Sequence, residues 1–71
     1  MSAMYSTAVQ RVTDSLTPEG GIGDAEQFSS ALRTLTFVVG HHPSTVAMGL
    51  VDAGMDGEEA AEIAFNLGAW V

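Results

Sequence analysis

Apolar residues recur at helical spacing in four segments of the chain, which three clusters of glycine and proline separate. The clusters lie at 17–23, 40–43 and 53–57, where glycine supplies turn dihedrals and proline interrupts helices. Each segment places apolar side chains at i, i+3, i+4 and i+7, the pattern of an amphipathic helix. The sequence therefore predicts an all-α fold, a compact bundle of about four short helices in one domain over residues 1–71.

The residues that flank the first two segments predict where these helices begin and end. The first helix should cover about residues 3–16, because Pro18 disfavours helix at the residue before it. The second should begin after Asp24, which stands at capping-box spacing from Gln27, and end at Gly40. The expected core stripes are Tyr5, Ala8, Val9, Val12 and Leu16, followed by Phe28, Ala31, Leu32, Leu35, Val38 and Val39.

The third and fourth helices have clear start signals. Pro43 suits the first position of a helix, and Gly49 in the middle of this helix indicates a close backbone contact. Asp56 and Glu59 stand at capping-box spacing at the start of the last helix, which Gly68 should close. The expected stripe of the third helix is Val46, Ala47, Leu50 and Val51.

The last helix has a narrow polar face and a wide apolar face. At about 100° per residue, the polar face holds Glu58, Glu59, Glu62 and Asn66. Apolar residues cover the rest of the circumference: Ala60, Ala61, Ile63, Ala64, Phe65 and Leu67. Since so wide an apolar arc can contact two neighbours, we expect this C-terminal helix to lie near the centre of the bundle.

Composition indicates a protein that binds another protein. Only Arg11 and Arg33 balance nine acidic residues, which gives a net charge of −7, although charged residues make up only 15% of the chain. Counted with its eight glycines and without its tyrosine, the chain is about 56% apolar, against a usual range of about 45–50%. A chain this short buries only about 60% of its unfolded surface, so this excess is hard to hide in one subunit. We therefore expect part of the apolar surface to be buried against a partner.

The sequence gives little support for catalysis or for metal binding. Cysteine is absent, and the adjacent His41 and His42 have no third ligand at metal-binding spacing, so a loop or helix-cap role is favoured over metal binding. Ser29, Ser30 and Ser44 lack the glycine elbow that presents a nucleophile. We predict a non-enzymatic protein with no cofactor and no metal.

Nucleic acid and membranes are also unfavoured as direct partners. Residues 62–68, EIAFNLG, resemble the EIA-x-x-LG string of DNA-binding helix-turn-helix domains, in which a recognition helix follows the glycine. Here only three residues follow it, and DNA affinity depends largely on lysine and arginine, of which the chain has two. The N-terminus lacks a signal-peptide pattern and no apolar run approaches the roughly 20 residues of a membrane span. A cytoplasmic location is expected.

Two functions therefore remain open. The first is a protein-binding or assembly module, homo-oligomeric or bound to another protein, that uses the apolar face of the last helix with an acidic rim. The alternative is a small acidic inhibitor of phage type, which covers the basic nucleic-acid-binding surface of a host protein, as an anti-defence protein or DNA mimic would. Phe37 and Phe65 fall off the core stripes, which favours an exposed binding surface. The predicted partner-binding residues are Glu58, Glu59, Glu62, Ile63, Phe65, Leu67 and Trp70.

Overall fold

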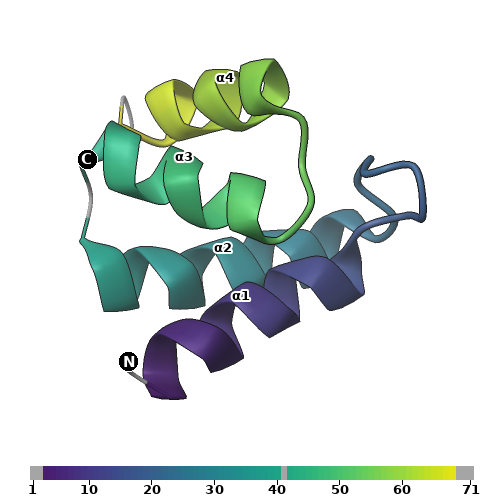
Figure 1. Cartoon of the computed structure of the whole chain (residues 1–71), viewed down its shortest axis with the longest axis horizontal. Coiled ribbons are helices and arrows are strands. Elements are labelled where there is room, and N and C mark those ends of the chain that lie inside the picture. Colours follow the sequence, from purple (N-terminus) through teal and green to yellow (C-terminus); the bar gives the residue numbers. More distant parts are fainter. Residues whose placement is uncertain (1–2, 41, 69–71) are drawn as a thin grey trace.

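Two pairs of helices lie in two layers (Figure 1). The computed structural model describes residues 3–40 and 42–68, the last two of them by backbone only. Within these residues the regular structure is four helices, α1 (Ala3–Ser15), α2 (Ala25–Val39), α3 (Pro43–Asp52) and α4 (Gly57–Gly68). The radius of gyration of 10.7 Å is close to the roughly 11 Å of a compact domain of this length. The predicted all-α bundle is confirmed.

The predicted capping residues begin and end the helices. The Asp24 carboxylate accepts a hydrogen bond from the backbone N–H of Gln27 at 3.1 Å, which satisfies one free donor of the first turn of α2. Gly40 ends α2 at a φ of 89°, and its N–H donates to the Thr36 carbonyl. Pro43 stands in the first turn of α3, where its missing N–H costs nothing.

Helix α3 joins the two layers. α1 packs along α2 and α4 packs along α3, while α3 also contacts both α1 and α2. A Cβ atom on Gly49 would lie 2.9 Å from both methyl carbons of Leu35, so the backbone of α3 lies directly against this side chain of α2, and Leu35 would have to shift to admit alanine. The close contact predicted at Gly49 is therefore confirmed.

The core extends through both layers. It takes side chains from all four helices and from the turn between α3 and α4. Its buried members are Ala8, Val12, Phe28, Ala31, Leu32, Leu35, Val46, Leu50, Ala53, Met55, Ala60 and Ala64. The other residues of the predicted stripes are partly buried and pack against this core. Val51 of α3 is the exception, because its side chain is 46% exposed.

Helix α4 differs from the central position expected for it. Among the described helices it contacts α3 alone, and it forms one outer edge of the molecule in Figure 1. Among the side chains of α4 that the structure describes, only those of Ala60 and Ala64 are fully buried, and they form a narrow stripe. One neighbouring helix is enough to cover that stripe. Beside it Ala61 and Ile63 are half-buried, whereas Phe65 is exposed.

Candidate functional site

An exposed aromatic side chain marks the outer face of the α3–α4 pair. Phe65 is 68% exposed and lines an open, almost wholly apolar groove of about 350 Å³ between the C-terminal part of α4 and the start of α3. Large apolar side chains exposed on a small protein often mark binding sites when they cluster. The groove is lined by His42, Pro43, Ser44, Ala47, Ala61 and Phe65.

The capping of α3 fixes the rim of this groove. His42 is the N-cap of α3, and its Nδ1 atom accepts a hydrogen bond from the backbone N–H of Ser44 at 3.3 Å. The Ser44 Oγ atom lies 2.7 Å from the same nitrogen. The helix-cap role predicted for the histidine pair is thus confirmed for His42, whereas His41 lies outside the described residues.

The apolar surface continues from the groove along α3. Val51 stands one helical turn after Ala47, so the two share a face, and Met48 borders them with 67% of its surface exposed. The inward face of α3 is taken by Val46, Gly49 and Leu50. We name the continuous outer patch the hairpin surface; it consists of Pro43, Ala47, Met48, Val51, Ala61 and Phe65.

Carboxylates line one side of the hairpin surface. Glu58 and Glu62 are exposed and stand three residues before Ala61 and Phe65, so each borders a member of the surface on the same side of α4. Glu59 is also exposed. Glu58 and Glu59 stand in the first turn of α4, where the helix dipole favours negative charge. Exposed carboxylates of α4 therefore border the apolar surface around Phe65.

The start of α4 is capped by a bond other than the expected one. Asp56 accepts a hydrogen bond through Oδ2 from the backbone N–H of Glu58 at 3.2 Å. The capping-box pattern predicted a bond to the N–H of Glu59 instead. Asp56 is exposed, so it adds a further carboxylate to this end of the hairpin.

The structure places the predicted partner-binding residues in different environments. Ile63 stands two positions before Phe65 and so points roughly 160° away from it around the helix. It is half-buried and packs against the core, outside the hairpin surface. The side chain of Leu67 and the whole of Trp70 lie outside the described residues.

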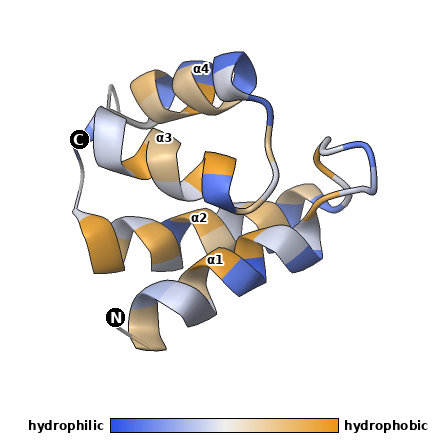
Figure 2. Cartoon of the chain, viewed as in Figure 1, coloured by the Kyte–Doolittle hydropathy of each residue, from blue (hydrophilic) through white to orange (hydrophobic). Residues whose placement is uncertain are grey.

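A second exposed aromatic, Phe37, lies on the other layer; its exposure follows from the sequence, although it is not among the predicted partner-binding residues. Phe37 of α2 is 81% exposed and Met4 of α1 is 58% exposed, and both line an open groove of about 400 Å³. The groove runs between the start of α1 and the end of α2. In Figure 2 the end of α2 has the hydrophobic colour. We name it the Phe37 groove; its lining residues are Ala3, Met4, Thr7, Arg11, Thr34, Phe37 and Val38.

One side chain with a shifted pKa has a structural role. The Tyr5 hydroxyl of α1 donates a hydrogen bond to Oδ2 of Asp52, at the end of α3. This hydrogen bond raises the pKa of Tyr5 above its ordinary value of 10.0, and burial and the negative charge of Asp52 act in the same direction. The hydrogen bond from the Tyr5 hydroxyl therefore ties α1 to α3.

Neither a candidate metal site nor a membrane-spanning helix occurs in the part of the chain that the structure describes. Within residues 3–40 and 42–68, no group of three or more His, Cys, Asp or Glu side chains is placed to hold a metal ion. None of the helices in this part of the chain is both long and apolar enough to cross a membrane. No family model, curated protein or solved structure matches the chain.

Proposed function

We propose that this protein is a non-enzymatic binding or assembly module that contacts another protein through the hairpin surface. The observation that carries the proposal is the exposure of Phe65 over an apolar groove, beside the carboxylates of Glu58 and Glu62. An aromatic side chain adds a large contact area at a small entropy cost, and such residues are frequent at binding hot spots.

The apolar patch supplies affinity and the carboxylates supply selectivity. Burying one large apolar side chain is worth about 1.5–3 kcal/mol, which corresponds to roughly 10- to 150-fold in a dissociation constant. Exposed charges at a rim contribute less to affinity, but they disfavour partners that present acidic surfaces. Glu58 and Glu62 therefore favour partners whose apolar contact area is bordered by basic residues.

Capture from host lysate by the immobilised protein tests this proposal. Phe65→Ser should weaken retention of the bound protein by about ten-fold or more, because the largest exposed group of the surface is lost. Ile22→Ser is the matched control: Ile22 is also exposed, at 41%, but lies in the loop between α1 and α2. Equal retention by the two variants, both folded as judged by circular dichroism, would contradict the proposal.

One observation favours the alternative function, an acidic inhibitor of a basic nucleic-acid-binding protein. Residues 42–68 hold five of the nine acidic residues and neither arginine, and the carboxylates of α4 are exposed. Such a surface attracts a basic protein by long-range electrostatics. In this case the captured protein should be basic, and salt should release it because exposed charge pairs are screened.

Charge reversal separates the two functions. Replacing Glu58, Glu59 and Glu62 together by lysine should abolish capture if the inhibitor function is right, since the steering charge is then inverted. If the hairpin surface binds mainly through apolar contact, the same variant should retain most of its partner at high salt, whereas Phe65→Ser should not.

A further inference from the structure

Both basic residues of the chain flank Phe37, the most exposed of the aromatic side chains that the structure describes. Arg11 of α1 lines the Phe37 groove. Arg33 precedes Phe37 by one turn of α2, so the two side chains leave the same face of the helix. Both arginines are exposed. In a chain that carries a net charge of −7, both positive charges therefore lie near Phe37, and that of Arg11 lies in the lining of its groove.

Each arginine has an acidic residue within two helical turns along its helix, but no acidic residue is among the described residues that line the groove. Arg11 is the only charged residue among the described residues that line the groove. Asp14 follows Arg11 by three residues and accepts a hydrogen bond from the Gln10 side-chain nitrogen at 2.9 Å. Glu26 lies two helical turns before Arg33. The Phe37 groove thus combines exposed apolar surface with positive charge.

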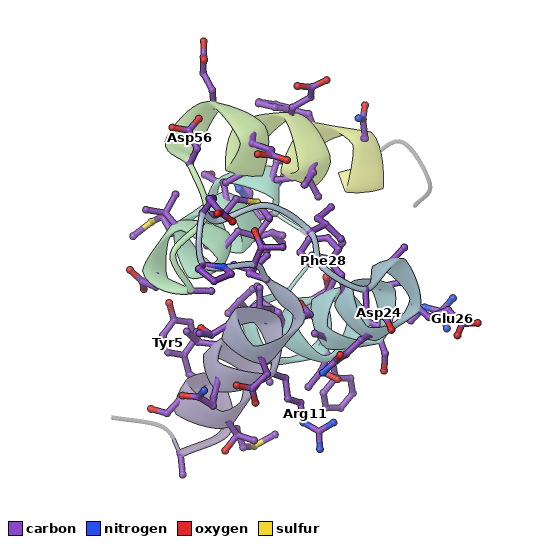
Figure 3. All side chains as sticks on the ribbon, turned by 90° about the vertical axis from the view of Figure 1, so that its right-hand side faces the viewer. Tyr5, Arg11, Asp24, Glu26, Phe28 and Asp56 are labelled. Carbon is purple, nitrogen blue, oxygen red and sulfur yellow. The ribbon has the colours of Figure 1, made fainter. Side chains whose placement is uncertain are left out.

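The hairpin surface has the complementary properties. It presents the exposed side chains of Phe65 and Met48. Its border carries the negative charges of Glu58 and Glu62, whereas the Phe37 groove carries the positive charge of Arg11. The two surfaces belong to different helical pairs, α1–α2 and α3–α4, which form separate layers (Figure 1). Figure 3 shows Arg11 projecting on the side of the molecule opposite to Asp56 at the start of α4. One molecule can therefore present both surfaces outward at the same time.

We propose that the Phe37 groove binds the hairpin surface of a second copy of this chain, so that copies associate head to tail. This inference rests on the proposed function, because it takes the hairpin surface as one half of the contact. Beyond the proposed function, the inference names the partner, which is a second copy of the chain. It also names the site on that copy, which is formed by Met4, Phe37 and the two arginines. A contact between two different surfaces is heterologous, and it repeats until it closes into a ring or continues as a filament.

The contact follows from the chemistry of the two surfaces. Phe65 and Met48 contact Phe37 and Met4, so that apolar area exposed on each copy is removed from water. Glu58 and Glu62 approach Arg11 and Arg33 at the rim, where charge pairs fix orientation more than they add affinity. A two-fold contact between two hairpin surfaces would instead bring like charges together, which disfavours that arrangement.

Mixing two variants tests the head-to-tail contact by sedimentation equilibrium. Phe65→Ser removes the anchor of the hairpin surface and Phe37→Ser removes that of the groove. Both side chains are largely exposed, so both variants should fold, as circular dichroism will check. Each variant alone should associate about thirty-fold more weakly than the wild type, which corresponds to the loss of one hot-spot residue. An equimolar mixture should form a dimer and nothing larger, because only one intact pair of surfaces remains.

The other outcomes separate this inference from the proposed function. If Phe37→Ser associates like the wild type while Phe65→Ser does not, the hairpin surface binds itself or another site, and the head-to-tail contact is overturned. A wild-type protein that stays monomeric at about millimolar concentration also overturns it. In both cases the lysate capture described above still tests the hairpin surface independently. Association unaffected by either substitution overturns this inference, and equal lysate capture by Phe65→Ser and Ile22→Ser would overturn the proposed function.

Discussion

The packing of Gly49 against Leu35 leads to a quantitative prediction for the contact between the two layers. In an exposed helix, replacing glycine by alanine stabilises the folded state by about 1 kcal/mol. At position 49 the added Cβ would lie 2.9 Å from both Leu35 methyl carbons and 3.3 Å from its Cγ atom. Leu35 is fully buried, so it can move only by disturbing its neighbours, and such overpacking costs about 1–3 kcal/mol.

The two effects together predict that Gly49→Ala lowers the free energy of unfolding by about 1 kcal/mol, or roughly 4–8 °C in Tm. Urea unfolding followed by circular dichroism measures the change. Gly57→Ala is the control, since a Cβ there meets nothing within 4 Å, and it should not destabilise the protein. Stabilisation by Gly49→Ala of about 1 kcal/mol would refute the reasoning, because alanine would then fit between the layers.

Leu35 also provides an internal check on the proposed cause. Leu35→Val shortens the side chain that the new Cβ would meet, so it should cost less in the Gly49→Ala background than in the wild type. Residues in contact show coupling of about 0.5–3 kcal/mol in such a double-mutant cycle. Additive effects of the two substitutions would mean that the clash is elsewhere.

Two further predictions concern the polar contacts that hold the helices. The raised pKa of Tyr5 means that its hydrogen bond to Asp52 stabilises the fold up to about pH 10 and is lost as the pH rises through the folded-state pKa. The excess stability of the wild type over Tyr5→Phe in urea unfolding should therefore shrink at alkaline pH, and a constant difference would contradict the assignment. Asp24→Ala should cost about 0.5–2 kcal/mol through loss of the cap on the Gln27 N–H, and Asp24→Asn much less; equal costs in urea unfolding would argue against this cap.

The local features of the fold could be predicted because they depend on residues close together in sequence. Asp24, Gly40 and Pro43 act where the sequence places them, since capping needs only the neighbouring turn. The exposure of Phe37 and Phe65 also follows from helical spacing, because both lie off the core stripes of their helices.

The relative placement of the helices could not be predicted in the same way. The alanines of α4 fit equally well beside one neighbour or between two, so the sequence did not reveal that α4 packs on α3 alone. Val51 follows the core spacing of α3, yet it faces outward because α3 directs Gly49 and Leu50 inward. Likewise, Met4 and Phe37 are far apart in sequence, and only the packing of α1 on α2 brings them to one groove.

Side-chain direction explains why the candidate site was foreseen only in part. The acidic rim and Phe65 were identified because the polar and apolar faces of α4 can be read from its spacing. Ile63 was grouped with Phe65 because both are apolar, although they point to opposite flanks of the helix. The contribution of α3 to the hairpin surface, above all Met48, requires knowing which face of α3 is free.

Site-specific photocrosslinking at position 65 tests the central claim most directly. A photoreactive benzoylphenylalanine in place of Phe65 reports any protein that contacts the hairpin surface, whether a second copy or another partner. The same group in place of Ile22, also exposed but in the loop between α1 and α2, is the matched control. We predict a crosslinked product at position 65 well above the yield at position 22. Equal yields at the two positions, in lysate and in concentrated pure protein, would contradict the assignment of the hairpin surface as a binding site.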